Sequence, residues 1–375
     1  MRSFGIEEEF LLVNAQTGEH AAIAENFFSG TAAETAKGSS GQGGRGRPTP
    51  ATSLAAEVQR EQVEAVSAPF TGLSDLAAAL RAGRAEADRQ ARAFGARIAA
   101  IGTSPLPALP HLIRSPRYLA MEERFGQPLR EQLMCGFHVH VSVNSPEEGV
   151  AVLDRIRIWL PVLIALSANS PYWQGKDTGY ASFRYQVWRR WPTAGPTEIF
   201  GSAQAYRNLV EMLLSCDVLL DRGMIYFDAR LSATYPTVEI RVPDVCTEPE
   251  HAVALAAIAR ALVETAARDW AAGEPPPAVP AELLRLASWR ASRFGIQDAL
   301  IHPLLNRPRP AGECVRALLD HIGPALTETG DGTLVEGTVA QILANGTGAQ
   351  RQRTVLDGSS NFHKVILDAA ARTSA

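Results

Sequence analysis

Three short segments of this chain alternate apolar and polar side chains with a period of two, as β-strands do when one face lies on a core. They span residues 4–13 (FGIEEEFLLV), 135–143 (CGFHVHVSV) and 237–242 (TVEIRV). The apolar positions of each segment share one side, and among them only Glu8 is charged. This pattern predicts a fold built around a sheet.

The polar sides of these strands carry side chains that are unusual for a solvent-exposed sheet, whose face normally holds Lys, Thr, Ser and Gln. They are, in chain order, Glu7, Glu9, His138, His140, Ser142, Thr237, Glu239 and Arg241. A fourth run, residues 224–230 (MIYFDAR), repeats the arrangement less regularly and adds Asp228 and Arg230. One such strand is equally consistent with a solvated face, but three together favour a functional face.

The pair Glu7 and Glu9 indicates the kind of chemistry. Two residues apart in a strand, their Cα atoms lie roughly 7 Å from each other. Two carboxylates that close repel unless a positive charge lies between them. Mg²⁺ takes oxygen ligands and commonly binds substrate phosphates as well. Carboxylates, imidazoles and arginines on one face therefore predict a site for a divalent cation and phosphoryl oxygens.

Other motifs for metal or nucleotide binding fit less well. His138 and His140 could form a zinc pair, but no HExxH run supports a zinc protease. Gly41, Gly43 and Gly46 match GxGxxG, yet no strand-like run precedes them and no helix directly follows, so a dinucleotide fold is disfavoured. Neither a P-loop nor a GxSxG nucleophile motif is present. The zinc pair stays open as an alternative.

The whole chain, residues 1–375, is predicted to form one catalytic domain. Residues 29–53 are small, polar and glycine-rich, so we expect a flexible loop there. Apolar spacing predicts helices over 74–97, with Ser74 as N-cap, and over 250–272. Further helices are expected at 149–168, 203–222, 281–294, 313–322, 333–344 and 361–372, which makes 281–372 a helical C-terminal part.

Composition limits the partners. A net charge of −4 gives no electrostatic footprint for nucleic acid or an anionic membrane. No apolar run is long enough for a transmembrane helix, and the N-terminus enters a strand-like segment at once instead of a targeting sequence. Four scattered cysteines indicate reduced thiols. We therefore expect a cytoplasmic enzyme that acts on small molecules.

Beyond these patterns, several blocks resemble one family. They are GIEEEFLLV (5–13), CGFHVHV (135–141), NSPYWQGKDTGYASFRYQVWRRWPTAG (169–195), PTVEIRVPDV (236–245) and GAQRQR (348–353). In these blocks the chain resembles the bacterial carboxylate–amine ligases of the glutamate–cysteine ligase type 2 group. The likeness spans nearly the whole chain, and the 169–195 block is long and specific. The glycine-rich stretch at 29–53 departs from it.

The resemblance implies an α+β fold similar to the catalytic domains of glutamine synthetase and the guanido kinases. In that fold a curved, mainly antiparallel sheet carries helices on its outer face and the active site on its concave face. The implied reaction uses ATP and Mg²⁺ or Mn²⁺. The γ-carboxyl of glutamate is phosphorylated, and an amine such as that of cysteine then displaces phosphate.

The resemblance also implies roles for particular residues. The metal ligands would be Glu7, Glu9, Glu64, His138 and Glu239. His138, Arg241 and Arg351 would contact the nucleotide, with Arg241 at the γ-phosphate and Arg230 supporting it. Arg184 would grip the carboxylate of the amino-acid substrate. Because an acyl phosphate must be kept from water, a closing loop is also expected. The aromatic-rich segment 172–191 is the best candidate for it, although its Trp and Tyr residues fit a core equally well.

Several of these roles have an alternative at the level of the sequence. A helix over 54–66 would place Glu57, Glu61 and Glu64 together on a solvated face. Arg184 could be a surface residue, and Arg351 part of a solvated helix end. The whole protein could be a phosphotransferase that forms no amide, or a binding protein without catalysis. The amine is not identified, and a homodimer is left open.

Overall fold

The computed structural model describes residues 1–28 and 51–374. Its centre is a seven-stranded, entirely antiparallel sheet in the order β2-β3-β1-β5-β9-β8, with β4 also pairing with β1. The strands are β1 (Phe4–Asn14), β2 (Thr52–Ala56), β3 (Gln62–Ser67), β4 (Ala96–Ala99), β5 (Phe137–Ser142), β8 (Ala229–Leu231) and β9 (Thr237–Ile240). The predicted α+β class with a mainly antiparallel sheet is confirmed.

Strand β1 runs through the middle of the sheet because its apolar residues reach the core at every second position. Phe4, Ile6, Phe10 and Leu12 are at most 2% exposed. On one edge β1 pairs with β3, and on the other it pairs first with β5 and then with β4. The long middle strand therefore fixes the positions of three neighbours at once.

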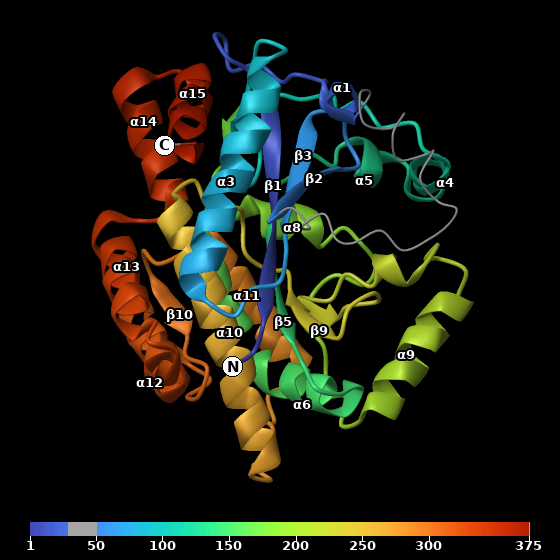
Figure 1. Cartoon of the computed structure of the whole chain (residues 1–375), viewed down its shortest axis with the longest axis vertical. Helices are drawn as coiled ribbons and strands as arrows, with labels where there is room; N and C mark the ends of the chain where they lie inside the picture. The colour runs from blue at the N-terminus through green and yellow to red at the C-terminus, as the bar shows by residue number, and fades with distance from the viewer. Residues whose placement is uncertain (29–50, 375) are drawn as a thin grey trace, which may run out of the picture.

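Helices α3 (Leu73–Arg92) and α10 (Pro249–Ala271) pack on the apolar side of the sheet and on each other. Figure 1 shows both to the left of β1, with α4 (Pro116–Phe125), α5 (Gln127–Arg130) and α9 (Ala203–Ser215) to its right. The two sides of the sheet therefore differ: long helices cover one side, and shorter helices and loops surround the other. The other elements of this middle part are α1 (Ala24–Phe28), α6 (Pro146–Ile156), α7 (Leu160–Ser167), β6 (Tyr172–Trp173), β7 (Lys176–Asp177), α8 (Phe183–Trp188) and the 3₁₀ turn η1 (Arg222–Met224).

The predicted helix over 74–97 is correct in its middle and wrong at both ends. Gly72, not Ser74, is the N-cap of α3, and the helix stops at Arg92. Gly95 takes a positive φ of 72°, a left-handed conformation that suits glycine and turns the chain out of the helix. The residues after it form β4, which pairs with β1.

Residues 51–67 form a hairpin, so the alternative of a helix over 54–66 is wrong. Strand β2 pairs with β3 from Thr52↔Ser67 to Ala56↔Val63. Pairing with β1 then fixes β3 in the sheet, which outweighs the weak local helical preference of an Ala/Glu-rich segment. Of the expected loop over 29–53, residues 29–50 lie outside the described residues, and its last two residues belong to β2.

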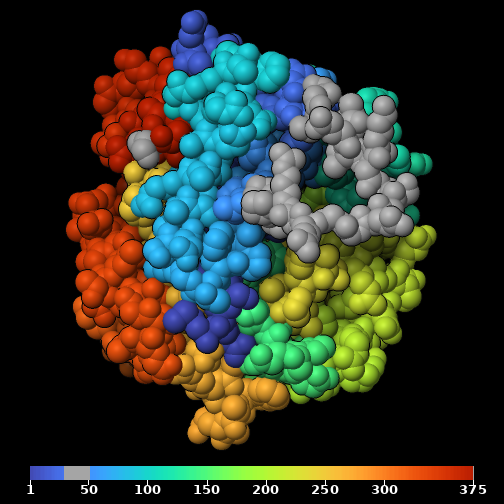
Figure 2. All heavy atoms as spheres, viewed as in Figure 1, coloured from blue at the N-terminus to red at the C-terminus, as the bar shows by residue number. Residues whose placement is uncertain are grey.

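The C-terminal quarter contains α11 (Ala281–Phe294), α12 (Ala311–Thr329), α13 (Gly332–Asn345), α14 (Gly348–Ser359) and α15 (Phe362–Thr373). Two features were missed there: helix α14 and a small hairpin of β10 (Ala299–Ile301) and β11 (Pro308–Pro310). In Figure 2 the red C-terminal helices and the light-blue α3 form a continuous surface along one side of the molecule. Within residues 1–28 and 51–374, no helix is long and apolar enough to cross a membrane.

Candidate active site

The register of the sheet gathers the predicted ligands into one row. Glu9 pairs with Glu64, Glu7 with His138, and Glu239 with both His140 and Arg230. Directly paired residues of antiparallel strands point to the same side of a sheet. These side chains therefore share the side opposite α3 and α10, which we call the polar face. It is defined by Glu7, Glu9, Glu64, His138, His140, Arg230 and Glu239.

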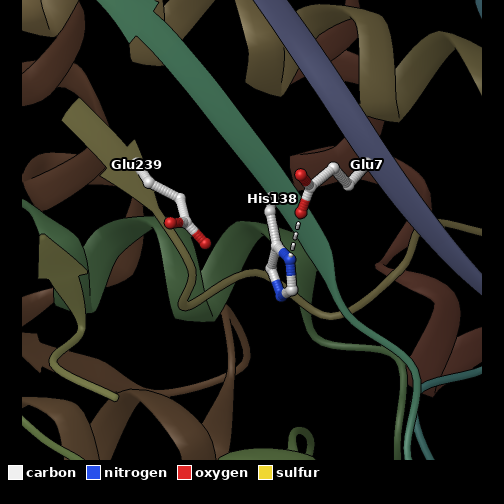
Figure 3. Close-up of side chains that lie close together, drawn as sticks. All are labelled: Glu7, His138 and Glu239. Atoms are coloured by element: carbon white, nitrogen blue, oxygen red, sulfur yellow. Dashed lines mark hydrogen bonds and ion pairs between the residues drawn. The ribbon is translucent and has the colours of Figure 1, made fainter. Parts of the chain in front are cut away.

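Two clusters of potential metal ligands lie on the polar face and share one histidine. Glu7, His138 and Glu239 form the first, and Glu9, Glu64 and His138 the second. In each cluster the ligand atoms lie within 4.8 Å of one another. Figure 3 shows the first cluster, with its three side chains coming from β1, β5 and β9. All five residues expected to bind metal are thus brought together.

His138 is arranged as a ligand. Its Nδ1 lies 3.1 Å from Glu7 Oε2, while its Nε2 lies 3.9 Å from Glu9 Oε1 and has no hydrogen-bond partner in the described part of the chain. Burial lowers the pKa of this imidazole to about 4, and the charge of Arg241 acts in the same direction. A proton on Nδ1 then serves Glu7, and the Nε2 lone pair stays free for a cation.

The carboxylates of the second cluster lie close to other acidic side chains that repel them. Burial raises the pKa of Glu64 well above its ordinary value, and the charges of Glu57, Glu7 and Glu9 raise it further. No arginine or lysine among residues 1–28 and 51–374 forms an ion pair with Glu9 or Glu64. A divalent cation would remove this repulsion, so the residues present fit such an ion.

Glu57 belongs to the same acidic group, and the sequence reasoning missed it. It directly follows β2, and burial together with Glu9 raises its pKa to about 8. The helical alternative for 54–66 had placed it in solvent. The alternation of Val63 and Ala65 with Gln62 and Glu64 is the signal that could have indicated a strand and drawn the preceding segment into the sheet.

Glu7 and His140 behave differently from the second cluster. Burial alone would raise the pKa of Glu7, but hydrogen bonds from His138 and His140 outweigh it and hold that pKa well below its usual range. His140 Nε2 lies 3.2 Å from Glu7 Oε1, and Nδ1 lies 3.1 Å from Thr237 Oγ1. His140 is part of neither ligand cluster. It supports Glu7 on the polar face.

Two arginines converge on Glu239. Arg230 Nε lies 2.7 Å from Glu239 Oε2, and Arg241 Nη1 contacts the other carboxylate oxygen. Two backbone carbonyls in the 223–225 turn fix the remaining end of the Arg230 guanidinium. Arg241 is 8% exposed, and its Nε has no hydrogen-bond partner in the described residues. The two predicted phosphate-binding arginines therefore stand beside the first cluster.

Arg184 is buried, so the alternative of a surface residue is wrong. Its guanidinium donates to the carbonyls of Val242 (3.3 Å) and Arg241 (3.4 Å) and lies 3.9 Å from Asp244. A Cβ on Gly136 would come within 2.0 Å of Arg184 Nη2 and within 2.9 Å of His138 Nε2. A side chain at position 136 would displace the Arg184 guanidinium, so glycine there lets Arg184 approach the ligand histidine.

Two further predictions concern Arg351 and the segment 172–191. The structure does not bring Arg351 to the polar face: it lies on α14, where its guanidinium pairs with Asp368 of α15 at 2.7 Å. Of the two interpretations of segment 172–191, burial favours the core, because Tyr185 and Val187 are each 1% exposed and pack in the main core. One of its aromatic rings, that of Trp188, lies against the guanidinium groups of Arg184 and Arg241. Aromatic content alone could not distinguish a lid from a core.

The comparisons with known proteins match this geometry. The glutamate-cysteine ligase family 2 (GCS2) model matches residues 3–365. A protein of Paenarthrobacter aurescens with the printed name "Putative glutamate–cysteine ligase 2-1" is 49% identical over all of this chain and 95% of its own length. A "Putative glutamate–cysteine ligase 2" of Streptomyces coelicolor is 46% identical over the full length of both. The chain belongs to glutamate-cysteine ligase family 2.

Solved structures share the fold of this family member at low sequence identity. Glutamate–cysteine ligase of Francisella tularensis in complex with AMP has a TM-score of 0.69 and 14% identity, over 100% of this chain and 88% of the other. A bifunctional glutathione synthetase of Pasteurella multocida has a TM-score of 0.67 over 100% of this chain and 52% of the other. The family assignment makes the protein an ATP-dependent ligase that joins a carboxylate to an amine.

Proposed function

We propose that this ligase activates the γ-carboxyl of glutamate as an acyl phosphate and joins it to an amine such as that of cysteine. The observation that carries the proposal is the double ligand cluster around His138, flanked by buried arginines. Such a site would accommodate polyphosphate beside a carboxylate substrate, because divalent cations and guanidinium groups both bind these anions. The names printed for two full-length relatives support glutamate and cysteine as substrates.

The two clusters would hold Mg²⁺ or Mn²⁺. Together they offer four carboxylates and one imidazole, an oxygen-dominated set that suits these ions better than zinc. When bound, the ions would neutralise charge on the β- and γ-phosphates of ATP. Glu57 stands close enough to interact electrostatically with Glu9 and Glu64, and we add it to the proposed ligands.

Different arginines would bind the phosphoryl group and the carboxylate of the substrate. Arg241 and Arg230 would stabilise the transferred phosphoryl group, because they stand beside Glu239 at the first cluster. Arg184 would hold the carboxylate of the amino acid, since its buried Nε lacks a hydrogen-bond partner within the described residues and its guanidinium reaches Gly136 beside His138. We still expect a cytoplasmic protein that acts on small-molecule substrates and has no nucleic-acid or membrane partner. Whether it forms a homodimer stays open.

Isotope transfer tests the proposal. The protein is incubated with ATP, Mg²⁺ and glutamate that carries ¹⁸O in its γ-carboxyl, together with cysteine or one of a panel of amines. An acyl phosphate requires one ¹⁸O to appear in inorganic phosphate for each amide formed. ADP formed without amide for every amine would support the phosphotransferase instead, and no ADP at all would support a binding protein.

Matched variants separate the site from the rest of the molecule. Glu239→Gln keeps the size of the side chain and should abolish turnover, because Glu239 belongs to the first cluster and holds both arginines. Glu86→Gln removes one exposed carboxylate from α3 and should keep full activity. Equal activity in both variants would place the chemistry elsewhere.

A further inference from the structure

Trp188, the last residue of α8, lies under two arginines that are both placed in the site. The Cζ atom of Arg241 is 5.2 Å from the centre of its ring, and that of Arg184 is 5.9 Å away. Both distances fall within the range of cation–π attraction, for which tryptophan offers the best ring. One indole therefore contacts the arginine proposed for phosphate and the arginine proposed for the acid.

Each guanidinium has polar partners without being fully paired: Arg241 contacts Glu239, and Arg184 donates to two backbone carbonyls and lies 3.9 Å from Asp244. Arg184 and Arg241 are 1% and 8% exposed, so water solvates them little. The Nε of each lacks a hydrogen-bond partner among residues 1–28 and 51–374. A desolvated cation gains more from an aromatic face than an exposed one does. The ring of Trp188 thus supplies part of the stabilisation that hydrogen bonds do not.

Trp188 itself is held in place. It is 9% exposed, and its ring meets that of Tyr226 edge-to-face, with centroids 4.7 Å apart. Tyr226 also contacts Trp191, which in turn meets Phe125 at 5.1 Å. The direct contact with Tyr226 fixes the plane of the indole and with it the place where the two cations rest.

We propose that Trp188 is a positioning residue that holds Arg241 and Arg184 ready for the phosphate and the acid substrate and makes the two arginines depend on one ring. This inference rests on the proposed function of the two arginines. If the ring fixes Arg241, its loss weakens recognition of the γ-phosphate, which ATP has and ADP lacks. A tryptophan that only fills space has no such selective effect.

The chain offers a matched control. Trp191 is 4% exposed and belongs to the same aromatic cluster, but no arginine within the described residues lies over its ring. Trp188→Phe and Trp191→Phe therefore remove the same atoms from neighbouring positions. Only the first change alters the ring beneath the guanidinium groups.

The experiment measures the dissociation constants of Mg·ATP and Mg·ADP for both variants by calorimetry, without turnover. We expect Trp188→Phe to reduce the preference for ATP over ADP by about fivefold, because phenylalanine retains part of the attraction, and Trp191→Phe to leave it unchanged. Equal losses for both nucleotides, or the same result for both variants, would overturn the inference. If the wild-type protein binds neither nucleotide, the proposed function fails first and the inference falls with it.

A second measurement serves if Trp188→Phe does not fold. Uniform incorporation of fluorinated tryptophan keeps the shape of each indole and withdraws electron density from its face, which weakens cation–π attraction. The wild-type protein so labelled should show a reduced preference for ATP, and a labelled Trp191→Phe protein should show the same reduction. An unchanged preference in the labelled wild type would refute the role of Trp188.

Discussion

Strand β1 carries three consecutive glutamates and places them in two opposite environments. Glu8 points to the apolar side, is 1% exposed, and forms two hydrogen bonds with the Arg84 guanidinium, at 2.6 and 3.1 Å. Glu7 and Glu9 point to the polar face, where histidines and further carboxylates surround them. Glu8 is therefore paired with an arginine of the chain, whereas no arginine or lysine among the described residues forms an ion pair with Glu7 or Glu9.

The buried pair is complete without any ligand. Arg84 donates not only to Glu8 but also to the carbonyls of Cys246, Thr247 and Thr373. One guanidinium thus joins β1, α3, the segment before α10 and the end of α15. A buried charge is tolerated when it is paired and hydrogen-bonded in this way. Glu8 therefore has a structural role, although a reading by residue type alone would have grouped it with its neighbours.

The polar face is incomplete by the same standard. Its carboxylates outnumber the cations that pair with them, and the pKa of Glu64 is raised well above its ordinary value by burial and by its acidic neighbours. Natural proteins keep such unfavourable clusters mainly where function requires them. We infer from the contrast that a ligand would complete the polar face, whereas the partner of the buried face is part of the chain.

Breaking the buried pair should have the largest effect. Arg84→Met leaves Glu8 unpaired in the core and should lower the free energy of unfolding by about 3–5 kcal/mol. Urea denaturation of metal-free protein measures this change. Adding Glu8→Leu to Arg84→Met removes the orphaned charge and should recover part of the loss. A cost below about 1 kcal/mol for the single variant would mean that the pair does not anchor β1.

Changing the polar face should instead affect ligand-linked stability. The raised pKa of Glu64 favours its protonated form in metal-free protein, so the uncharged Glu64→Gln variant should change unfolding in chelator less than it changes the response to Mg²⁺. With Mg²⁺ at a hundred times its dissociation constant, wild-type protein should gain about 2.7 kcal/mol, and the variant should lose much of this gain. A variant that responds to Mg²⁺ like the wild type would exclude Glu64 from the site.

The pH dependence of the free energy of unfolding should report the acidic group of the polar face, through Glu57. The pKa of Glu57 is near 4.5 in an unfolded chain and about 8 in the fold, so between these values the folded state keeps a proton that the unfolded state has released. The free energy of unfolding of metal-free protein should therefore fall as the pH rises through this window, by up to about 1.4 kcal/mol per pH unit. Melting temperatures measured in chelator should show this slope, and excess Mg²⁺ should reduce it.

Asp228 provides the control for the pH experiment. Burial raises its pKa to about 7, but it hydrogen-bonds Tyr185 and belongs to neither ligand cluster. Asp228→Asn should flatten the slope equally with and without Mg²⁺, whereas Glu57→Gln should flatten it only without the metal. Equal behaviour of the two variants would show that Glu57 does not face the cation.

An exposed pair on the same helix as Arg84 should give the smallest effect. Glu86 and Arg89 lie 2.6 Å apart, with side chains 44% and 69% exposed. Solvent screens such pairs, so Glu86→Gln should leave unfolding and Mg²⁺ binding without measurable change. A loss comparable to that of Arg84→Met would show that position on α3, not burial of the charge, determines stability.

The sequence was sufficient wherever a local pattern decided the structure. Strand periodicity placed Glu7, Glu9 and His138 on one face, and the register of the sheet confirms that they point together. It failed where distant pairing decided. The hairpin that carries Glu57 and Glu64 is Ala/Glu-rich and becomes strand because β1 provides an edge.

Other partners could not be predicted because they come from far along the chain. Arg84 reaches Glu8 from α3 across 76 positions, and no spacing rule connects them. Arg351 was placed by resemblance alone, and the fold gives it Asp368 instead. Local patterns thus identify which residues carry the chemistry, while tertiary contacts determine which charges are already neutralised.

The most direct test of the double cluster is anomalous X-ray scattering from crystals soaked with Mn²⁺ and a non-hydrolysable ATP analogue. We predict two manganese peaks on the polar face, one coordinated by Glu7, His138 and Glu239 and the other by Glu9 and Glu64, with no peak at Glu8. Manganese elsewhere in the molecule, or none within coordination distance of these side chains, would contradict the assignment of the polar face as the metal and nucleotide site.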